Sequence, residues 1–261
     1  KTIKLEACPI WLLTCGTFGT NILYGTIDST KQADCVRSIK EKLVLLPDYI
    51  YRPIKGKDFD NRSQISNVRR KNYIDFAIGQ KDKRVAEAAG RGYSLANKFW
   101  DEVAETINGH IAIGAASNSS NAVVDQARAQ DEPYGSIFAC TAGSLDRVEG
   151  KFYHNLAASG MGWTEILFDC VDETDLRETV GIQSRDPLAP LVDITMSWRQ
   201  LGLDETRFNE ILAIATRDCN GDMDKVNREC YSIWSRGGVS NPLTKPQLET
   251  IFNSECEPKV Q

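Results

Sequence analysis

Residues 90–102 read GRGYSLANKFWDE. The Gly-Arg-Gly run predicts a loop, Phe99 and Trp100 predict the end of a buried strand, and Asp101 and Glu102 place two carboxylates directly after it. A carboxylate at such a strand end can join the metal shell of a bound nucleotide, and the next one can orient or deprotonate an attacking water. The stretch therefore favours nucleotide chemistry on a sheet, although the same run is also typical of a strand that simply ends in solvent.

The residues upstream of this stretch alternate between strand and helix patterns. Residues 21–27 predict a buried strand, and Asp28 can cap the helix that follows it. Residues 29–46 predict that helix, because their apolar residues recur at helical spacing up to a proline. Residues 65–78 form two short aromatic and β-branched runs around a polar turn, which predicts a hairpin.

The residues downstream of the acidic pair continue the alternation. Residues 136–140 and 165–168 predict two more buried strands, and residues 121–130 and 150–159 predict helices between and after them. Strands that alternate with helices are typical of an α/β fold with a largely parallel sheet. In such a fold, ligands bind at the carboxyl ends of the strands.

Beyond about residue 172 the pattern becomes polar and helical. Helices are predicted over residues 196–201, 205–215 and 223–234, and no further strands are expected. We therefore predict an α/β core over residues 1–171 and a small helical subdomain or linker over residues 172–261.

Charge and cysteine content restrict the function classes. The net charge of −5 provides no general attraction to a polyanion, so nucleic-acid contacts would depend on basic runs such as 69–71 and 81–84. The eight cysteines include no CxxC pair, and only His110 and His154 could join them, so no zinc site is expected. Thiols inside apolar runs favour a reduced, intracellular protein. No apolar run is long enough to span a membrane.

The first two residues, Lys1 and Thr2, match the last two positions of a P-loop. In a P-loop ATPase the order of parts is a Gly-rich loop, a lysine, a serine or threonine, a helix, and later the acidic strand end. The segment after Thr2 follows this order, although Pro9 predicts that the first helix is kinked or short. Two residues at the start of a sequence can also match by chance.

Five segments together resemble one family. They are the two residues Lys1-Thr2 before the first helix, the stretch 45–49 (LLPDY), the stretch 90–102, the run IFACTAG at 137–143 with GKFY at 150–153, and NRECY at 227–231. In this order they resemble the ATPase domain of the large subunit of tailed-phage terminases, the motors that package DNA into procapsids. The likeness covers nearly the whole chain.

The resemblance implies a role for each matching residue. Lys1 would meet the β- and γ-phosphates of ATP, and Thr2 and Asp101 would hold Mg²⁺. Glu102 would activate the attacking water, and Arg91 would be a finger supplied to a neighbouring subunit. The remaining pair, Cys140 and Thr141, would form the coupling motif that transmits loss of the γ-phosphate to domain motion.

The resemblance also implies a setting and a fold. The fold would be a three-layer P-loop NTPase core with a small helical subdomain. ATP and Mg²⁺ would be the ligands, and double-stranded DNA, a portal protein and a small terminase subunit the partners. The chain would act as a homo-oligomeric ring in the host cytoplasm, docked transiently on the procapsid portal, and no membrane would be involved.

Departures from the family pattern leave alternatives open. The Gly-rich part of the P-loop and the following nuclease domain are missing from this sequence, so we expect this chain to bind ATP poorly as it stands. Pro9 is unexpected in the first helix, and Cys140 replaces the more typical serine or threonine. A helicase-like P-loop ATPase and a non-catalytic, truncated remnant are the alternative interpretations.

A calcium loop is a further alternative in the C-terminal part. Asp218, Asn220, Asp222 and Glu229 fall at positions 1, 3, 5 and 12 of an EF-hand loop. The sharp-turn position is occupied by Met223 rather than glycine, which disfavours the required backbone. The competing prediction is a polar turn that caps the next helix.

Overall fold

The computed structural model describes residues 2–58, 64–92, 95–158, 163–165, 182–184, 191–195 and 203–234. Within them a mixed sheet of eight strands has the order β2-β3-β1-β4-β5-β8-β7-β6. The five central strands of that order, β3 to β8, run parallel. Strand β2 pairs antiparallel with β3, and β7 pairs antiparallel with both β8 and β6. The strands are β1 (Asn21–Thr26), β2 (Gln64–Asn67), β3 (Asn72–Ile78), β4 (Asn97–Asp101), β5 (Gly135–Cys140), β6 (Trp163–Glu165), β7 (Ile182–Ser184) and β8 (Leu191–Thr195).

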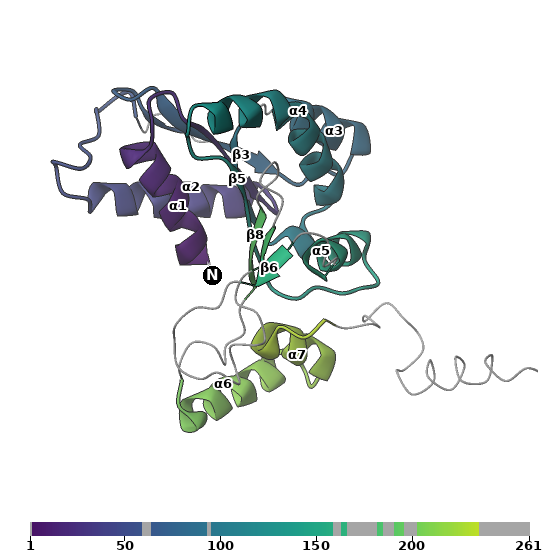
Figure 1. Ribbon diagram of the computed structural model, residues 1–261. Coiled ribbons are helices and arrows are strands. Elements are labelled where there is room, and N and C mark those ends of the chain that lie inside the picture. Colours follow the sequence, from purple (N-terminus) through teal and green to yellow (C-terminus); the bar gives the residue numbers. More distant parts are fainter. Residues whose placement is uncertain are drawn as a thin grey trace, which may run out of the picture.

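Helices cover both faces of this sheet, which gives the predicted three layers (Figure 1). One hydrophobic core lies beneath α1 and α2, and a second lies beneath α4 and α5, with α3 packed against α4. The helices are α1 (Thr2–Cys15), α2 (Ser29–Val44), α3 (Lys83–Arg91), α4 (Gly109–Ala129), α5 (Val148–Ala158), α6 (Glu205–Asp218) and α7 (Met223–Tyr231), with a short 3-10 turn η1 (Val103–Glu105). The α/β prediction with a largely parallel sheet is confirmed.

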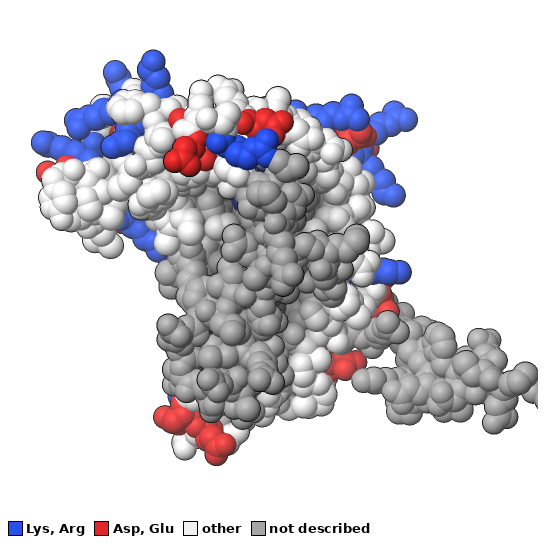
Figure 2. Space-filling model, viewed as in Figure 1, with Lys and Arg blue, Asp and Glu red and all other residues white. Residues whose placement is uncertain are grey.

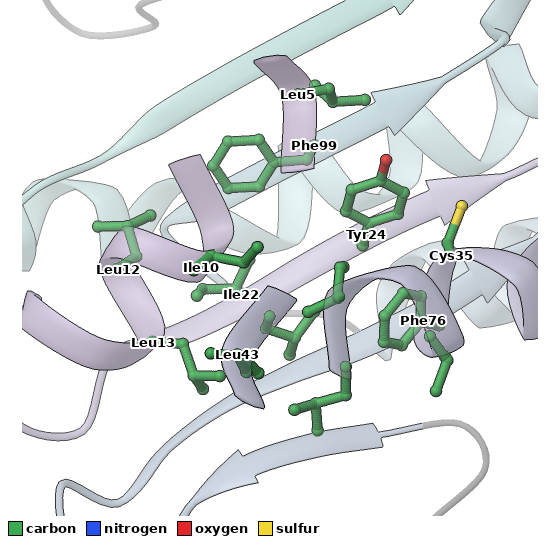
Figure 3. Close-up of a cluster of buried hydrophobic side chains, with 14 of the residues drawn as sticks. Leu5, Ile10, Leu12, Leu13, Ile22, Tyr24, Cys35, Leu43, Phe76 and Phe99 are labelled. Atoms are coloured by element: carbon green, nitrogen blue, oxygen red, sulfur yellow. The ribbon is translucent and has the colours of Figure 1, made fainter. Parts of the chain in front are cut away.

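Strand β4 is held in place by the alternation of its side chains. Phe99 is buried in the core of α1 and α2, and Trp100 is buried in the core on the opposite face. Figure 3 shows Phe99 and Tyr24, from neighbouring strands, within the first core, with Cys35 of α2 beside Tyr24. Because successive strand residues point to opposite faces, both aromatic residues are buried only in this register.

The strand-helix unit at residues 21–46 and the hairpin at residues 65–78 are confirmed. The Asp28 side chain accepts a hydrogen bond from the backbone N–H of Lys31 at 2.8 Å and caps α2. Helix α1 runs through Pro9 without ending, so the expected shortening is wrong. Its apolar side chains are buried against the sheet, and buried Glu6 forms an ion pair with Lys42 of α2. This tertiary packing offsets the hydrogen bond that proline removes.

Two predictions about element boundaries are wrong. Gly90 and Arg91 belong to α3 rather than to a loop, because Asp82 caps the helix and the intervening residues are good helix formers. Strands also continue beyond residue 172, where none was expected. One of them, β8, pairs in parallel with β5, so the sheet extends past residue 171.

Some predicted features lie outside the described residues. These are the strand positions 166–168 and the helix 196–201. The helices predicted at 121–130, 150–159, 205–215 and 223–234 are confirmed as α4 to α7, although α4 already begins at Gly109, well before its predicted start. Among the described residues, no helix is long and apolar enough to cross a membrane.

A buried lysine lies on the acidic strand. Lys98 of β4 is 5% exposed, and its ammonium group donates to the carbonyl oxygen of Leu95 at 3.3 Å. Burial lowers the pKa of Lys98 to about 8. Between pH 8 and the ordinary lysine value the unfolded chain keeps this proton and the folded chain loses it, so the contribution of Lys98 to stability rises with pH. Below pH 8 the full cost of burying the charge remains.

We expect Lys98→Met to be more stable than the original chain at pH 7, by about 1 to 3 kcal/mol, and this gain to shrink by pH 10. Urea unfolding of both proteins at the two pH values measures the difference, in which all other titrating groups cancel. Lys83→Met, at an exposed position, is the control and should show no such trend. A gain of equal size at both pH values would show that Lys98 does not titrate in this range.

Candidate functional site

The candidate site lies where three parallel strands end at one edge of the sheet. Strands β1, β4 and β5 are neighbours, and their carboxyl ends lead directly to Ile27, Glu102 and Thr141. Side chains that follow adjacent parallel strands meet at this edge, which is where α/β sheets bind ligands.

Asp101 is the last residue of β4 and is 1% exposed. Its position in the sheet is fixed by pairing with Ala139 of β5. Burial raises the pKa of the Cys35 thiol to about 11, and the Asp101 carboxylate adds to this shift.

Glu102 follows in a left-handed backbone conformation, with φ 55° and ψ 46°. Its N–H donates to the carbonyl oxygen of Ala139 at 2.8 Å, which anchors the turn to β5. A non-glycine residue in this region carries strain of about 1 to 2 kcal/mol. The turn redirects the chain immediately after β4 and brings the Glu102 side chain over the end of β5.

The Glu102 carboxylate is held by the two residues of the predicted coupling motif. Its Oε2 accepts hydrogen bonds from the backbone N–H of Thr141 at 3.3 Å and from the Thr141 hydroxyl at 3.2 Å. The buried Cys140 thiol also donates to Oε2 at 3.8 Å. The same sulfur accepts from the N–H of Ala104 at 3.2 Å. The ends of β4 and β5 are therefore joined through one carboxylate.

A cavity of about 470 Å³ opens beside this carboxylate. Glu102, Thr141 and Ala142 line it from the sheet edge, and α2, η1, α7 and the residue before α5 supply further charged side chains. The cations are Lys31, Arg147, Lys225 and Arg228, and the other carboxylates are Glu105 and Glu229. This volume lies within the range of small-molecule sites, and the mixture of cations and carboxylates suits a phosphate-bearing ligand with a metal ion.

The donor set fits Mg²⁺ better than a metal that needs a complete protein cage. Among the described residues, no group of three or more His, Cys, Asp or Glu side chains could hold a metal ion by itself. Magnesium keeps several waters and is usually bound by one or two carboxylates together with the phosphates of a substrate. Asp101 ends β4 directly before Glu102, but it is buried and is not among the residues that line the cavity.

The structure brings together four of the predicted site residues, namely Asp101, Glu102, Cys140 and Thr141. Thr2 begins α1, and the last turn of that helix accepts hydrogen bonds from Asn67 and Asn72 at the opposite, amino edge of the sheet. The helix therefore starts from the side on which the acidic pair lies. Lys1 lies outside the described residues, and nothing is described of the Thr2 side chain.

Arg91 is not part of this cluster. It lies in the last turn of α3, before the amino end of β4, whereas Asp101 ends that strand roughly 13 Å further along. Its side chain is 70% exposed and forms an ion pair with Glu87 one helical turn earlier. Any contact of Arg91 with a nucleotide would therefore have to involve another subunit.

None of the four cavity cations was predicted as a site residue. Lys225 and Arg228 come from α7, far along the chain from the acidic pair. Arg228 belongs to the NRECY run at 227–231, but that run predicted no role for it at the cavity. The calcium-loop alternative is not supported, because α6 ends at Asp218 and α7 already begins at Met223. Asp222 instead caps α7 by accepting from the N–H of Lys225 at 3.1 Å, as the competing prediction had it.

Comparison with known proteins adds one resemblance. No protein-family model matches the sequence, and no curated protein matches it either. The structure is similar to the large terminase ATPase domain of Thermus phage P74-26, with a TM-score of 0.47, 12% identity, and coverage of 90% of this chain and 85% of that one. An arginine-to-alanine mutant of the same domain gives the same score and identity, with 86% of that chain covered.

These structures belong to the family that the sequence motifs resemble.

The strained turn at Glu102 can be tested without any ligand. Glu102→Gly and Glu102→Ala both remove the carboxylate, but only glycine tolerates a left-handed conformation without cost. We expect the glycine variant to be more stable than the alanine variant by about 1 kcal/mol in urea unfolding. The same pair of substitutions at Glu105, which lies within η1, should favour alanine. Equal stabilities of the two Glu102 variants would contradict the strained turn.

Proposed function

We propose that this chain is the ATP-hydrolysing part of a phage terminase large subunit, a motor that moves double-stranded DNA into procapsids. The observation that carries the proposal is the acidic pair at the end of β4, whose second carboxylate is hydrogen-bonded to Thr141 at the end of β5. This contact joins the predicted hydrolytic residue to the predicted coupling motif. The motif order along the chain supports the choice of family.

Each of these residues would have a separate role in ATP hydrolysis. Asp101 and the hydroxyl of Thr2 would hold Mg²⁺, which when bound neutralises charge on the phosphates. Glu102 would orient a water and accept its proton. Lys1 and the cavity cations would bind the phosphate groups of ATP.

Cys140 and Thr141 would connect hydrolysis to motion. Both side chains contact the Glu102 carboxylate, so a displacement of this carboxylate would alter their hydrogen bonds and hence the end of β5. The Cys140 sulfur also accepts a hydrogen bond from the N–H of Ala104, so a shift of Cys140 would also displace η1. From there α5 can be displaced, because it packs against η1.

DNA would be held by its phosphates rather than by its bases. The basic runs at residues 69–71 and 81–84 are largely exposed, and Figure 2 shows Lys and Arg side chains projecting at the upper ends of one face. A portal protein and a small terminase subunit would be the protein partners, in a ring docked on the procapsid in the host cytoplasm. Helices α6 and α7 would form the subdomain that leads to a nuclease domain.

The acidic pair is tested by Glu102→Gln in this chain and in a version extended by the coding sequence upstream. We expect the substitution to lower the ATP hydrolysis rate by about 10² to 10⁴-fold with ATP binding retained, because a general base is lost while the phosphate contacts remain. Phosphate release and nucleotide titration measure the two quantities.

Glu41→Gln, at an exposed position on α2, is the matched control and should leave the rate unchanged. A normal rate in the Glu102→Gln protein would contradict the catalytic assignment. The absence of hydrolysis in both versions of the original chain would favour the non-catalytic remnant.

Arg91 is proposed to act on the nucleotide of a neighbouring subunit, where a guanidinium that is always charged would stabilise the transferring phosphoryl group. We expect Arg91→Ala to lower the hydrolysis rate of the assembled protein by about 10³-fold or more. Mixing Arg91→Ala and Glu102→Gln subunits should restore part of the activity, because some interfaces then combine an intact arginine with an intact glutamate. Failure of every mixing ratio to restore activity would show that Arg91 does not act between subunits.

A further inference from the structure

Three of the cavity cations have no carboxylate partner. Lys31, Lys225 and Arg228 form no ion pair within 4 Å with any carboxylate of the described residues, whereas Arg147 is paired with Glu105. Cations that gather at a cavity without partners repel one another, and this arrangement becomes favourable when an anion binds between them.

Two of these cations come from one face of α7. Lys225 and Arg228 are three residues apart and therefore neighbours on the helix surface, and both line the cavity. The opposite face of α7 is buried through Val226 and Cys230. The helix thus presents a charged face to the cavity and an apolar face to the protein.

The end of α7 is attached to the α/β core by aromatic contacts. The Trp234 ring lies 5.9 Å from that of Tyr153 and 5.1 Å from that of His154, both on α5. The same indole also lies near Gly143, which follows the coupling motif. Aromatic pairs at these separations are attractive, so α7 is positioned against the edge of the sheet that carries the acidic pair.

We propose that Lys225 and Arg228 are phosphate-binding residues and that α7 closes the cavity over the phosphate chain of the ligand. That the ligand is a nucleotide rests on the proposed function; that it is a polyphosphate rests on the cations and the carboxylates of the cavity. Arg228 binds two phosphate oxygens at once through its planar guanidinium, and Lys225 adds a point charge beside it. Phosphate binding then fastens the helical part of the chain to the end of β5.

The test measures binding of inorganic tripolyphosphate with Mg²⁺ to this chain by calorimetry. We expect Arg228→Ala to weaken binding about tenfold or more, because a charge-assisted contact is lost, and Lys225→Ala to weaken it less. Arg228→Lys should recover part of the affinity. Arg217→Ala, which removes an exposed arginine of α6 that is paired with Asp218, is the matched control and should bind as the original chain does.

Amide hydrogen exchange shows whether the ligand binds at α7, because binding to another surface would not change the exchange rate of this helix. Exchange in α7 should slow with tripolyphosphate in the original chain and in Arg217→Ala, but not in Arg228→Ala. Thermal unfolding of each variant shows whether it is folded, and Arg228→Gln replaces the alanine variant if that one is not.

Two results would overturn the inference. One is no binding of tripolyphosphate to the original chain, and the other is binding that Arg228→Ala leaves unchanged. These results are distinct from failure of the proposed function. If tripolyphosphate binding depends on Arg228 but the chain hydrolyses no ATP, the phosphate site is supported and the proposed motor function is contradicted. If ATP hydrolysis depends on Glu102 but not on Arg228, the motor function is supported and the role of Arg228 is contradicted.

Discussion

The structure of the site depends on the contact between the Glu102 carboxylate and Thr141. It requires the chain to turn sharply as soon as β4 ends, and the left-handed conformation of Glu102 supplies that turn. The strain is offset by two hydrogen bonds to Thr141 and by the anchoring of the Glu102 N–H on Ala139. Strain that is retained by surrounding structure in this way is typical of functional sites.

The sheet provides the rigidity that this contact needs. Phe99 and Trp100 bury opposite faces of β4 in two cores, so the strand cannot slip by one residue without exposing both. Asp101 is consequently fixed at the edge, and pairing with β5 brings Cys140 and Thr141 alongside it. The burial of Lys98 on the same strand lowers stability near neutral pH, and the two cores must outweigh it.

The sequence was sufficient for the parts of the site that are local. Asp101 and Glu102 were predicted because they follow an apolar pair, and Thr141 because its run, 137–143, resembles the coupling motif of the terminase family. Arg91 was misplaced in a loop, since its flanking glycines outweighed the cap at Asp82 and the alanines of α3. Strand β8 could not be predicted from its short pattern, because only pairing with β5 makes it part of the sheet. The same holds for Arg228, which reaches the cavity through tertiary packing of α7.

The central claim is that the carboxyl edge of β1, β4 and β5 is a site for a metal-bound triphosphate. A crystal structure with Mg²⁺ and a non-hydrolysable ATP analogue tests it most directly. The account predicts that the metal lies against Asp101, with the phosphates between Glu102 and Arg228. A smaller cavity, lined by Phe18, Asn97 and Gln126, lies at the amino ends of the strands. Binding of the analogue in that cavity instead would contradict the account.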